Sequence, residues 1–188
     1  ESTQTYYRLV NQHVRTALGG LHSAKVVLYS VDFAEIEALQ HQGNWEATAE
    51  ILAAAVSIPL LHIADATARV LQRQGIACVG LLGTRFTMEQ AFYTERLKGY
   101  GINVLTPEMA GRQVIHDIIY NELCKGETRA SSKEIYQQII EQMAADGAQA
   151  VILGCTEIGM LIKSGDVSIP VLDTTEIHCE SIVDFMLG

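Results

Sequence analysis

The stretch AQAVILGCTE, residues 148–157, decides the fold class of this 188-residue chain. Its apolar, β-branched first part predicts a buried strand of a parallel sheet, and the polar GCTE segment follows where that strand ends. Similar short apolar runs occupy residues 24–31, 76–82 and 102–105. The sequence therefore predicts several short parallel strands.

Helical patterns separate these runs. Their apolar residues recur every three or four positions, which is typical of amphipathic helices packed on a sheet. Strands that alternate with helices indicate an α/β fold with a mostly parallel sheet flanked by helices. The predicted helices span residues 2–17, 32–55, 88–100, 114–123 and 135–145, with a short one near 158–163.

An internal duplication predicts two pseudo-symmetric halves. VSIPLL at 56–61 recurs as VSIPVL at 167–172. We expect residues 1–75, with a C-terminal helix at 174–188, to form the first half and residues 76–173 the second. Duplicated α/β units commonly bind a ligand at the carboxyl ends of their strands, so we expect the site in the cleft between the halves.

The duplication also predicts a missing block. The second VSIP copy follows residues 148–166, whereas the first copy follows a predicted helix directly. Either the protein has lost half of its site, or the sequence joins residues across an absent segment between Ala55 and Val56, and we favour the second explanation. A strand before Glu1 is expected to be missing as well.

Composition excludes several classes of partner. Lys and Arg number 13 against 22 Asp and Glu, a net charge of −9, which disfavours nucleic acid and anionic membranes. No segment has the roughly 18 apolar residues of a membrane span, and the six histidines and four cysteines show no metal-ligand spacing. A cytoplasmic enzyme acting on a small molecule, without a metal, is expected.

Two strand ends carry chemically useful side chains. Cys155 lies between a predicted strand and a helix, where backbone N–H groups and the helix dipole are expected to lower the thiol pKa from about 8.5. Thr84 and Thr87 follow another strand and could bind a carboxylate. The alternatives are a small buried side chain at Cys155 and simple helix capping at Thr84 or Thr87.

Other polar residues favour structural interpretations. Cys78 and Cys179 are predicted to be structural. His62 and Asp65 could face the cleft, but capping of a helix by Asp65 or Thr67 is the favoured interpretation.

Three motifs resemble the cofactor-independent aspartate/glutamate racemase family: GCTEI at 154–158, LGT at 82–84 with TM at 87–88, and ST at 2–3 with YY at 6–7. In that family two α/β halves each supply a cysteine, the substrate α-carbon lies between the sulfurs, and pyridoxal phosphate is not used. The resemblance implies an amino-acid substrate, a homodimer and a catalytic Cys155. It also implies substrate-binding residues, which are Thr84, Thr87, Thr156, Glu157, Lys125 and His41.

The sequence departs from this family at two points. The second cysteine would fall in the absent block near residues 55 and 56. Family members selective for aspartate bring a cation to the side-chain carboxylate, yet no Lys or Arg occurs from Val26 to Ala68. His41 and Lys125 are the available candidates.

The resemblance implies an aspartate/glutamate racemase. The alternatives are a racemase of less acidic amino acids, a related isomerase of the hydantoin racemase or maleate isomerase kind, and a degenerate carboxylate-binding protein.

Overall fold

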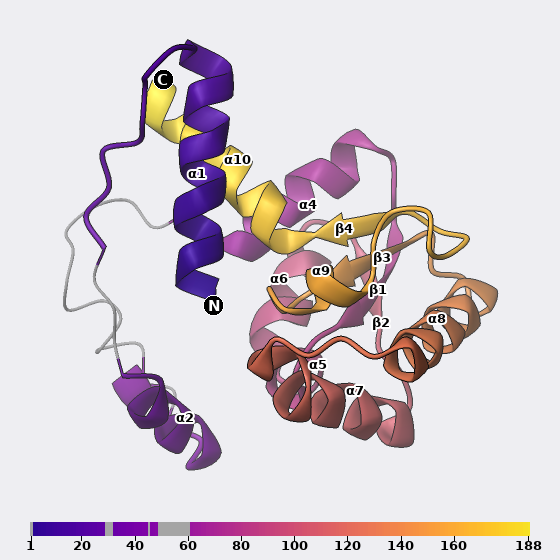
Figure 1. The fold of residues 1–188 in the computed structure, drawn as a ribbon. Helices are drawn as coiled ribbons and strands as arrows, with labels where there is room; N and C mark the ends of the chain where they lie inside the picture. Colours follow the sequence, from indigo (N-terminus) through magenta and orange to yellow (C-terminus); the bar gives the residue numbers. More distant parts are fainter. Residues whose placement is uncertain (1, 29–31, 45, 49–60) are drawn as a thin grey trace. The chain divides into compact units, whose positions relative to one another are not determined.

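The computed structural model describes residues 2–28, 32–44, 46–48 and 61–188 (Figure 1). These fall into two compact units, Glu1–Ser23 with Leu61–Gly188, and Ala24–Leu60, and each is described by itself. In the first unit the elements are α1 (Ser2–Leu18), α4 (Ile63–Arg73), β1 (Cys78–Leu82), α5 (Arg85–Glu89), α6 (Ala91–Gly99), β2 (Asn103–Leu105), α7 (Met109–Asn121), the 3₁₀ turn η1 (Leu123–Lys125), α8 (Ala130–Ala145), β3 (Ala150–Leu153), α9 (Ile158–Leu161), β4 (Val171–Asp173) and α10 (Thr174–Leu187). The second unit contains α2 (Phe33–His41).

The larger unit is built on a four-stranded sheet in the order β2-β1-β3-β4, with every neighbouring pair parallel. Leu82, the last residue of β1, pairs with Leu153, the last residue of β3. The α/β class with a helix-flanked parallel sheet is thus confirmed. This register also places the carboxyl ends of β1 and β3 side by side.

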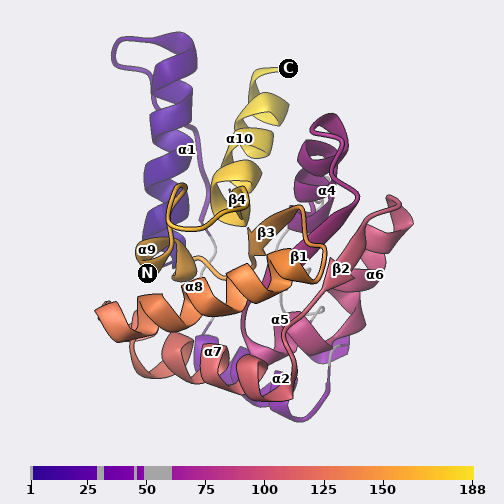
Figure 2. The ribbon, with the colours of Figure 1, turned by 90° about the vertical axis from the view of Figure 1, so that its right-hand side faces the viewer.

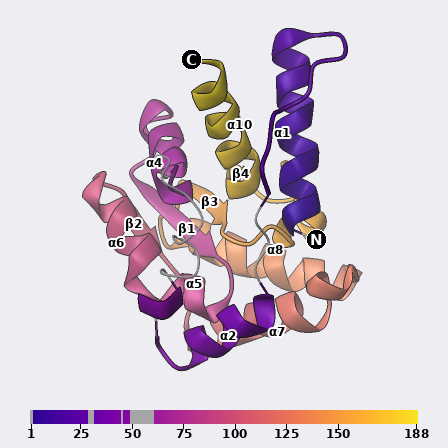
Figure 3. The ribbon, with the colours of Figure 1, turned by 90° about the vertical axis from the view of Figure 1, so that its left-hand side faces the viewer.

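Helices cover both faces of the sheet because its central strands are apolar on both sides. Val151 and Leu153 pack into a core with α7 and α8 (Figure 2), whereas Ala150 and Ile152 pack into a core with α4, α6 and α10 (Figure 3). All four side chains are at most 1% exposed. Burial on both faces explains why β3 reads as a continuous apolar run rather than an alternating one.

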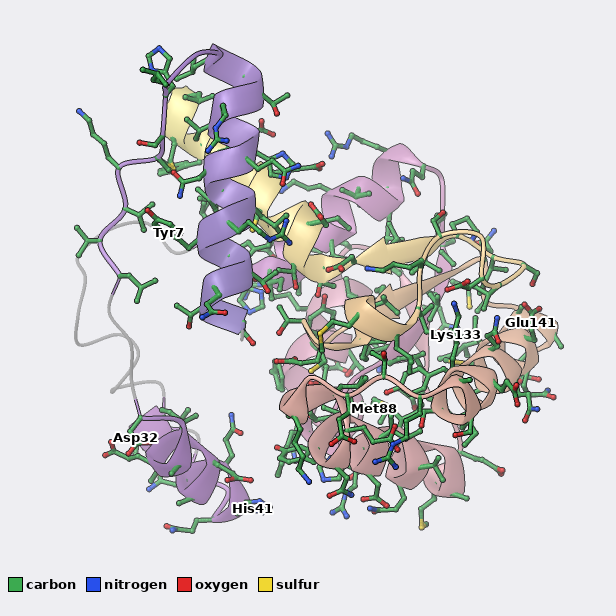
Figure 4. The ribbon with its side chains drawn as sticks, viewed as in Figure 1. Tyr7, Asp32, His41, Met88, Lys133 and Glu141 are labelled. Carbon is green, nitrogen blue, oxygen red and sulfur yellow. The ribbon has the colours of Figure 1, made fainter. Side chains whose placement is uncertain are left out.

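Two side chains of α8 hold the segment that leads into β4 (Figure 4). Lys133 Nζ lies 2.8 Å from Asp166 Oδ2, and Glu141 Oε1 accepts a hydrogen bond of 2.7 Å from the Ser168 amide. Ser168 belongs to the second VSIP copy. Residues 56–60 of the first copy lie outside the described residues, so the expected pseudo-symmetry stays a prediction, as does the division at residues 75 and 76.

A hydrogen-bonded chain connects α1, α10 and the residue preceding the His62 cap of α4. Tyr6 Oη lies 3.0 Å from His178 Nδ1, and His178 Nε2 lies 2.9 Å from the Leu61 carbonyl oxygen. Because a carbonyl can only accept, Nε2 carries a proton, and in the neutral imidazole Nδ1 then accepts from the Tyr6 hydroxyl. Burial lowers the pKa of His178, which favours the neutral ring in this chain of hydrogen bonds.

Acidification should destabilise the protein through its histidines. Burial is the main cause that lowers the pKa values of His62 and His178 from the usual 6.5. As the pH falls below about 6.5, these histidines bind protons in the unfolded chain before they do so in the folded protein. The free energy of unfolding should therefore decrease. We expect the melting temperature to drop by a few degrees between pH 7.5 and 5.5.

Thermal unfolding of His178→Gln and His22→Gln checks this expectation. His178→Gln should flatten the pH dependence, whereas replacement of His22, which is exposed, should leave it unchanged. Equal slopes for wild type and His178→Gln would contradict the role given to His178.

The strand predicted at 24–31 is wrong for its described part. Residues 24–28 form no strand, and Val27 is 99% exposed. The β-branched sequence alone is not enough, because a strand also needs a place in a sheet, and the sheet of the described residues consists of β2, β1, β3 and β4. Residues 29–31 of this prediction lie outside the described residues.

Two predicted helices are divided. The helix predicted at 32–55 is interrupted after α2, where Gly43 has a φ of +69°, a conformation that favours glycine. Residues 46–48 are helical again, and 49–55 lie outside the described residues. The helix predicted at 88–100 becomes α5 and α6, because Gln90 has an extended backbone.

Candidate active site

Cys155 lies just beyond the carboxyl end of β3, in the turn that leads to α9. The turn is attached to the neighbouring strand, since the Gly154 amide donates a 2.6 Å hydrogen bond to the Leu82 carbonyl. The half-buried thiol is therefore held at the edge where β1 and β3 end together.

Close packing at Gly154 brings the threonine loop to the same place. A Cβ added to Gly154 would lie 2.9 Å from the Leu82 carbonyl oxygen and 3.0 Å from Thr87 Cγ2. The Thr87 methyl group thus lies over the residue that precedes Cys155. The structure brings the two strand-end segments that were singled out in the sequence into contact.

Thr84 is the N-cap of α5, as the capping alternative predicted. Its Oγ1 accepts a hydrogen bond of 3.4 Å from the Thr87 amide and lies 3.2 Å from Thr87 Oγ1. α5 has five residues, so its dipole is small and one of its free amides is already occupied. The hydroxyl groups of Thr84 and Thr87 remain as hydrogen-bonding groups at the strand end.

Glu157 is the centre of a hydrogen-bond network around the thiol. Cys155 Sγ donates to Glu157 Oε2 at 2.9 Å, and Thr156 Oγ1 lies 2.9 Å from the same oxygen. Ser2, from α1, lies 3.1 Å from Glu157 Oε1 and 2.7 Å from Thr156 Oγ1. Ser2 was part of a recognised motif but was not predicted as a site residue, because nothing in local sequence spacing connects it with a residue 155 positions away.

The expected lowering of the Cys155 pKa is wrong. Burial raises the pKa of this thiol, and the negative charge of Glu157 raises it further. The helix that was expected to favour the thiolate, α9, has four residues, and its N-cap position holds Glu157 itself. Cys155 is thus a thiol in the resting protein.

Glu157 is ionised. Burial raises the pKa of its carboxyl group, but hydrogen bonds from Cys155, Thr156 and Ser2 outweigh burial and the net shift is downward. Three contacts join the hydroxyls of Ser2 and Thr156 to each other and to the carboxylate, yet the two hydroxyls have only two protons to donate. One of these three contacts therefore lacks a proton, whereas the Cys155 thiol donates its own proton to Glu157.

Comparison with known proteins identifies the family. The sequence profile described as Asp/Glu/Hydantoin racemase matches residues 48–182. The chain belongs to this family.

Solved structures of similar proteins agree with this assignment. A Yersinia pestis protein assigned as an Asp/Glu racemase is 45% identical, with a TM-score of 0.92 over 100% of this chain and 94% of the other. An aspartate racemase homologue from Pyrococcus horikoshii OT3 is 28% identical, with a TM-score of 0.82 over the same shares of the two chains. The parallel sheet and its flanking helices are thus those of the Asp/Glu/hydantoin racemase family.

A curated relative is the broad specificity amino-acid racemase RacX of Bacillus subtilis (strain 168). It is 25% identical over 134 residues, which cover 71% of this chain. The chain spans 57% of the length of RacX.

Two further residues predicted to bind substrate, Lys125 and His41, lie on other elements than Cys155. Lys125 is exposed on η1, a turn that packs against α9. His41, labelled in Figure 4, is exposed on α2 in the other unit, where its Nε2 lies 3.7 Å from Glu37 Oε1. Their roles stay predictions.

His62 and Asp65 have structural partners in this family member. His62 is the N-cap of α4, since its Nδ1 accepts from the Ala64 amide at 3.1 Å. Asp65 binds Arg96 through two hydrogen bonds of 2.6 and 2.8 Å. The predicted capping by Asp65 or Thr67 is wrong, because His62 caps α4 and Thr67 Oγ1 donates to the Ile63 carbonyl within the helix.

Within residues 2–28, 32–44, 46–48 and 61–188, no group of three or more His, Cys, Asp or Glu side chains could hold a metal ion. In the same ranges, no helix has the length and apolar character that crossing a membrane requires.

Proposed function

We propose that the chain is a pyridoxal-phosphate-independent amino-acid racemase that acts on aspartate or glutamate, with Cys155 as one of two acid/base groups. The observation that carries this proposal is the Cys155 thiol at the joined ends of β1 and β3, hydrogen-bonded to an ionised Glu157. Membership of a racemase family supports the reaction class.

Stereoinversion needs one group to remove the α-proton from one face and another to deliver a proton to the opposite face. Since Cys155 rests as a thiol, it delivers its proton to the α-carbon while a second base removes the original proton. The enzyme then holds a Cys155 thiolate and a protonated second base, and the reverse reaction restores both. The second group is expected near residues 55 and 56, outside the described residues.

The α-proton of an amino acid is very weakly acidic, so the carbanion formed without pyridoxal needs hydrogen-bond donors at its carboxylate. The hydroxyls of Thr84 and Thr87 are proposed to provide them, because Thr87 packs over the residue next to Cys155. Thr156 and Glu157 are proposed to complete this side of the site. Lys125 and His41 are the proposed cations for a side-chain carboxylate.

Racemisation of a wider range of amino acids is the second candidate function. The similarity to RacX, a broad specificity amino-acid racemase, favours it. Among the described residues, moreover, no Lys or Arg side chain forms an ion pair with Glu157, whose partners are Cys155, Thr156 and Ser2. Turnover of aspartate and glutamate well above that of alanine, serine and lysine would favour the first candidate, and similar rates for all five would favour the second.

Proton exchange in deuterated water tests the reaction itself. Each enantiomer of aspartate or glutamate, supplied alone, should give a product labelled at the α-carbon, without added pyridoxal phosphate or metal. In Cys155→Ser, exchange from one enantiomer should fall more than from the other, and by the family's geometry we expect the L-enantiomer to lose more.

Chiral chromatography with mass spectrometry measures these labels. Equal loss for both enantiomers would indicate a single shared base. A requirement for added pyridoxal phosphate would overturn the proposed mechanism.

A further inference from the structure

We propose that Ser2 and Glu157 are positioning residues, in which Ser2 fixes the Glu157 carboxylate against the thiol and Glu157 keeps the resting proton on Cys155. This inference rests on the proposed role of Cys155 as an acid/base. According to this inference, the first turn of α1, which carries Ser2, helps to set how strong a base the Cys155 thiolate is.

The two carboxylate oxygens of Glu157 have different partners. Oε2 accepts from the Cys155 thiol at 2.9 Å, while Oε1 lies 3.1 Å from the Ser2 hydroxyl. A carboxylate bound through both oxygens cannot rotate about its terminal bond without breaking a contact. Ser2 therefore fixes the direction in which Glu157 presents its charge to the sulfur.

Ser2 is itself held by the packing of α1. Ser2 and Tyr6 are four residues apart and so lie on one face of the helix. Tyr6 is hydrogen-bonded to His178 of α10, and α1 lies alongside α10 (Figures 2 and 3). The network thus joins the β3–α9 turn to two long helices, which gives the Ser2 hydroxyl a defined position.

Of the groups in the described part of the chain that interact with the Cys155 thiol, Glu157 is the one that carries a charge. Cys124 of η1 and Tyr136 of α8 also interact electrostatically with Cys155. Burial raises the pKa values of both, so each is neutral at physiological pH. The charge that opposes a Cys155 thiolate therefore comes from Glu157.

The repulsion between the Glu157 carboxylate and a Cys155 thiolate affects the proton transfer. A thiol that holds its proton tightly yields, once deprotonated, a thiolate that is a stronger base. When Cys155 gives its proton to the carbanion, the sulfur is left negative beside Glu157. That thiolate is suited to remove the weakly acidic α-proton of the product enantiomer, and the proton then returns from the α-carbon to sulfur.

Alkylation of the intact protein by iodoacetamide tests the network without reference to racemisation. Only the thiolate form of a cysteine reacts with iodoacetamide. At a pH well below the thiol pKa, lowering that pKa by one unit increases the thiolate fraction about tenfold. At pH 8.5, Cys155 should react at least about tenfold faster in Glu157→Gln than in wild type. Peptide mass spectrometry distinguishes alkylation of Cys155 from alkylation of the exposed Cys124. Glu157→Asp keeps a carboxylate at this position, so Cys155 should still react slowly in that variant.

Ser2 has a matched control in Thr3, which is exposed on the same turn of α1. Ser2→Ala should accelerate alkylation by a smaller factor than Glu157→Gln and lower kcat with little change in KM. Ser2→Thr should restore both values, and Thr3→Ala should resemble wild type.

Unchanged alkylation of Cys155 in folded Glu157→Gln, alkylation as fast in Glu157→Asp as in Glu157→Gln, or equal behaviour of Ser2→Ala and Thr3→Ala would overturn the inference. Full racemase activity in a Cys155→Ala variant would instead overturn the proposed function and leave the alkylation result interpretable.

Discussion

Replacing Cys155 with alanine should abolish racemisation in both directions. An acid/base group of this kind typically contributes about 10²- to 10⁴-fold to the rate, so kcat/KM should fall by that factor or below detection. Cys155 is only partly buried and its side chain is small, so the fold should persist. Chirally resolved assays of each enantiomer, with thermal unfolding as a check on the fold, measure both expectations.

Cys124 provides a matched thiol control. It lies on η1, which packs against α9, and it is exposed. Cys124→Ser should retain racemisation close to the wild-type rate, whereas Cys155→Ser should not. If Cys155→Ala retained full turnover while Cys124→Ser lost it, the acid/base assignment would belong to the other thiol.

The parallel sheet could be predicted because its strands are buried on both faces. The apolar runs at 76–82, 102–105 and 148–153 contain β1, β2 and β3, and the second VSIP copy leads into β4. The run at 24–31 is also short, mostly apolar and rich in β-branched residues, yet residues 24–28 are not a strand. Composition indicates that a segment can form a strand, but pairing decides whether it does so.

The position of Cys155 could be predicted, but its protonation could not. The strand-end context correctly placed the thiol at the edge of the sheet. The direction of its pKa shift depends on burial and on Glu157, whose carboxylate turns back to contact the sulfur two residues before it. The Ser2 contact is equally inaccessible to local patterns, because it arises only when α1 packs near α9.

The last prediction concerns Gly154, which allows the two strand ends to meet. A Cβ at this position would lie 2.9 Å from the Leu82 carbonyl oxygen, 3.0 Å from Thr87 Cγ2 and 3.1 Å from Leu81 Cδ1. The carbonyl belongs to β1 and also accepts the Gly154 amide hydrogen bond, so it cannot move aside without breaking that bond. Gly154→Ala must therefore push the turn carrying Cys155 away from β1.

We expect Gly154→Ala to destabilise the protein by about 1–3 kcal/mol, as overpacking of a core does, and to lower kcat by about 10²-fold, as a displacement of about 1 Å at a reacting group can. Gly99→Ala is the matched control, because a Cβ there meets nothing within 4 Å and α6 favours alanine over glycine. Denaturant unfolding and racemisation assays of the two variants test the difference. A Gly154→Ala enzyme as stable and as active as Gly99→Ala would show that the catalytic thiol does not depend on this close approach of β1 and β3.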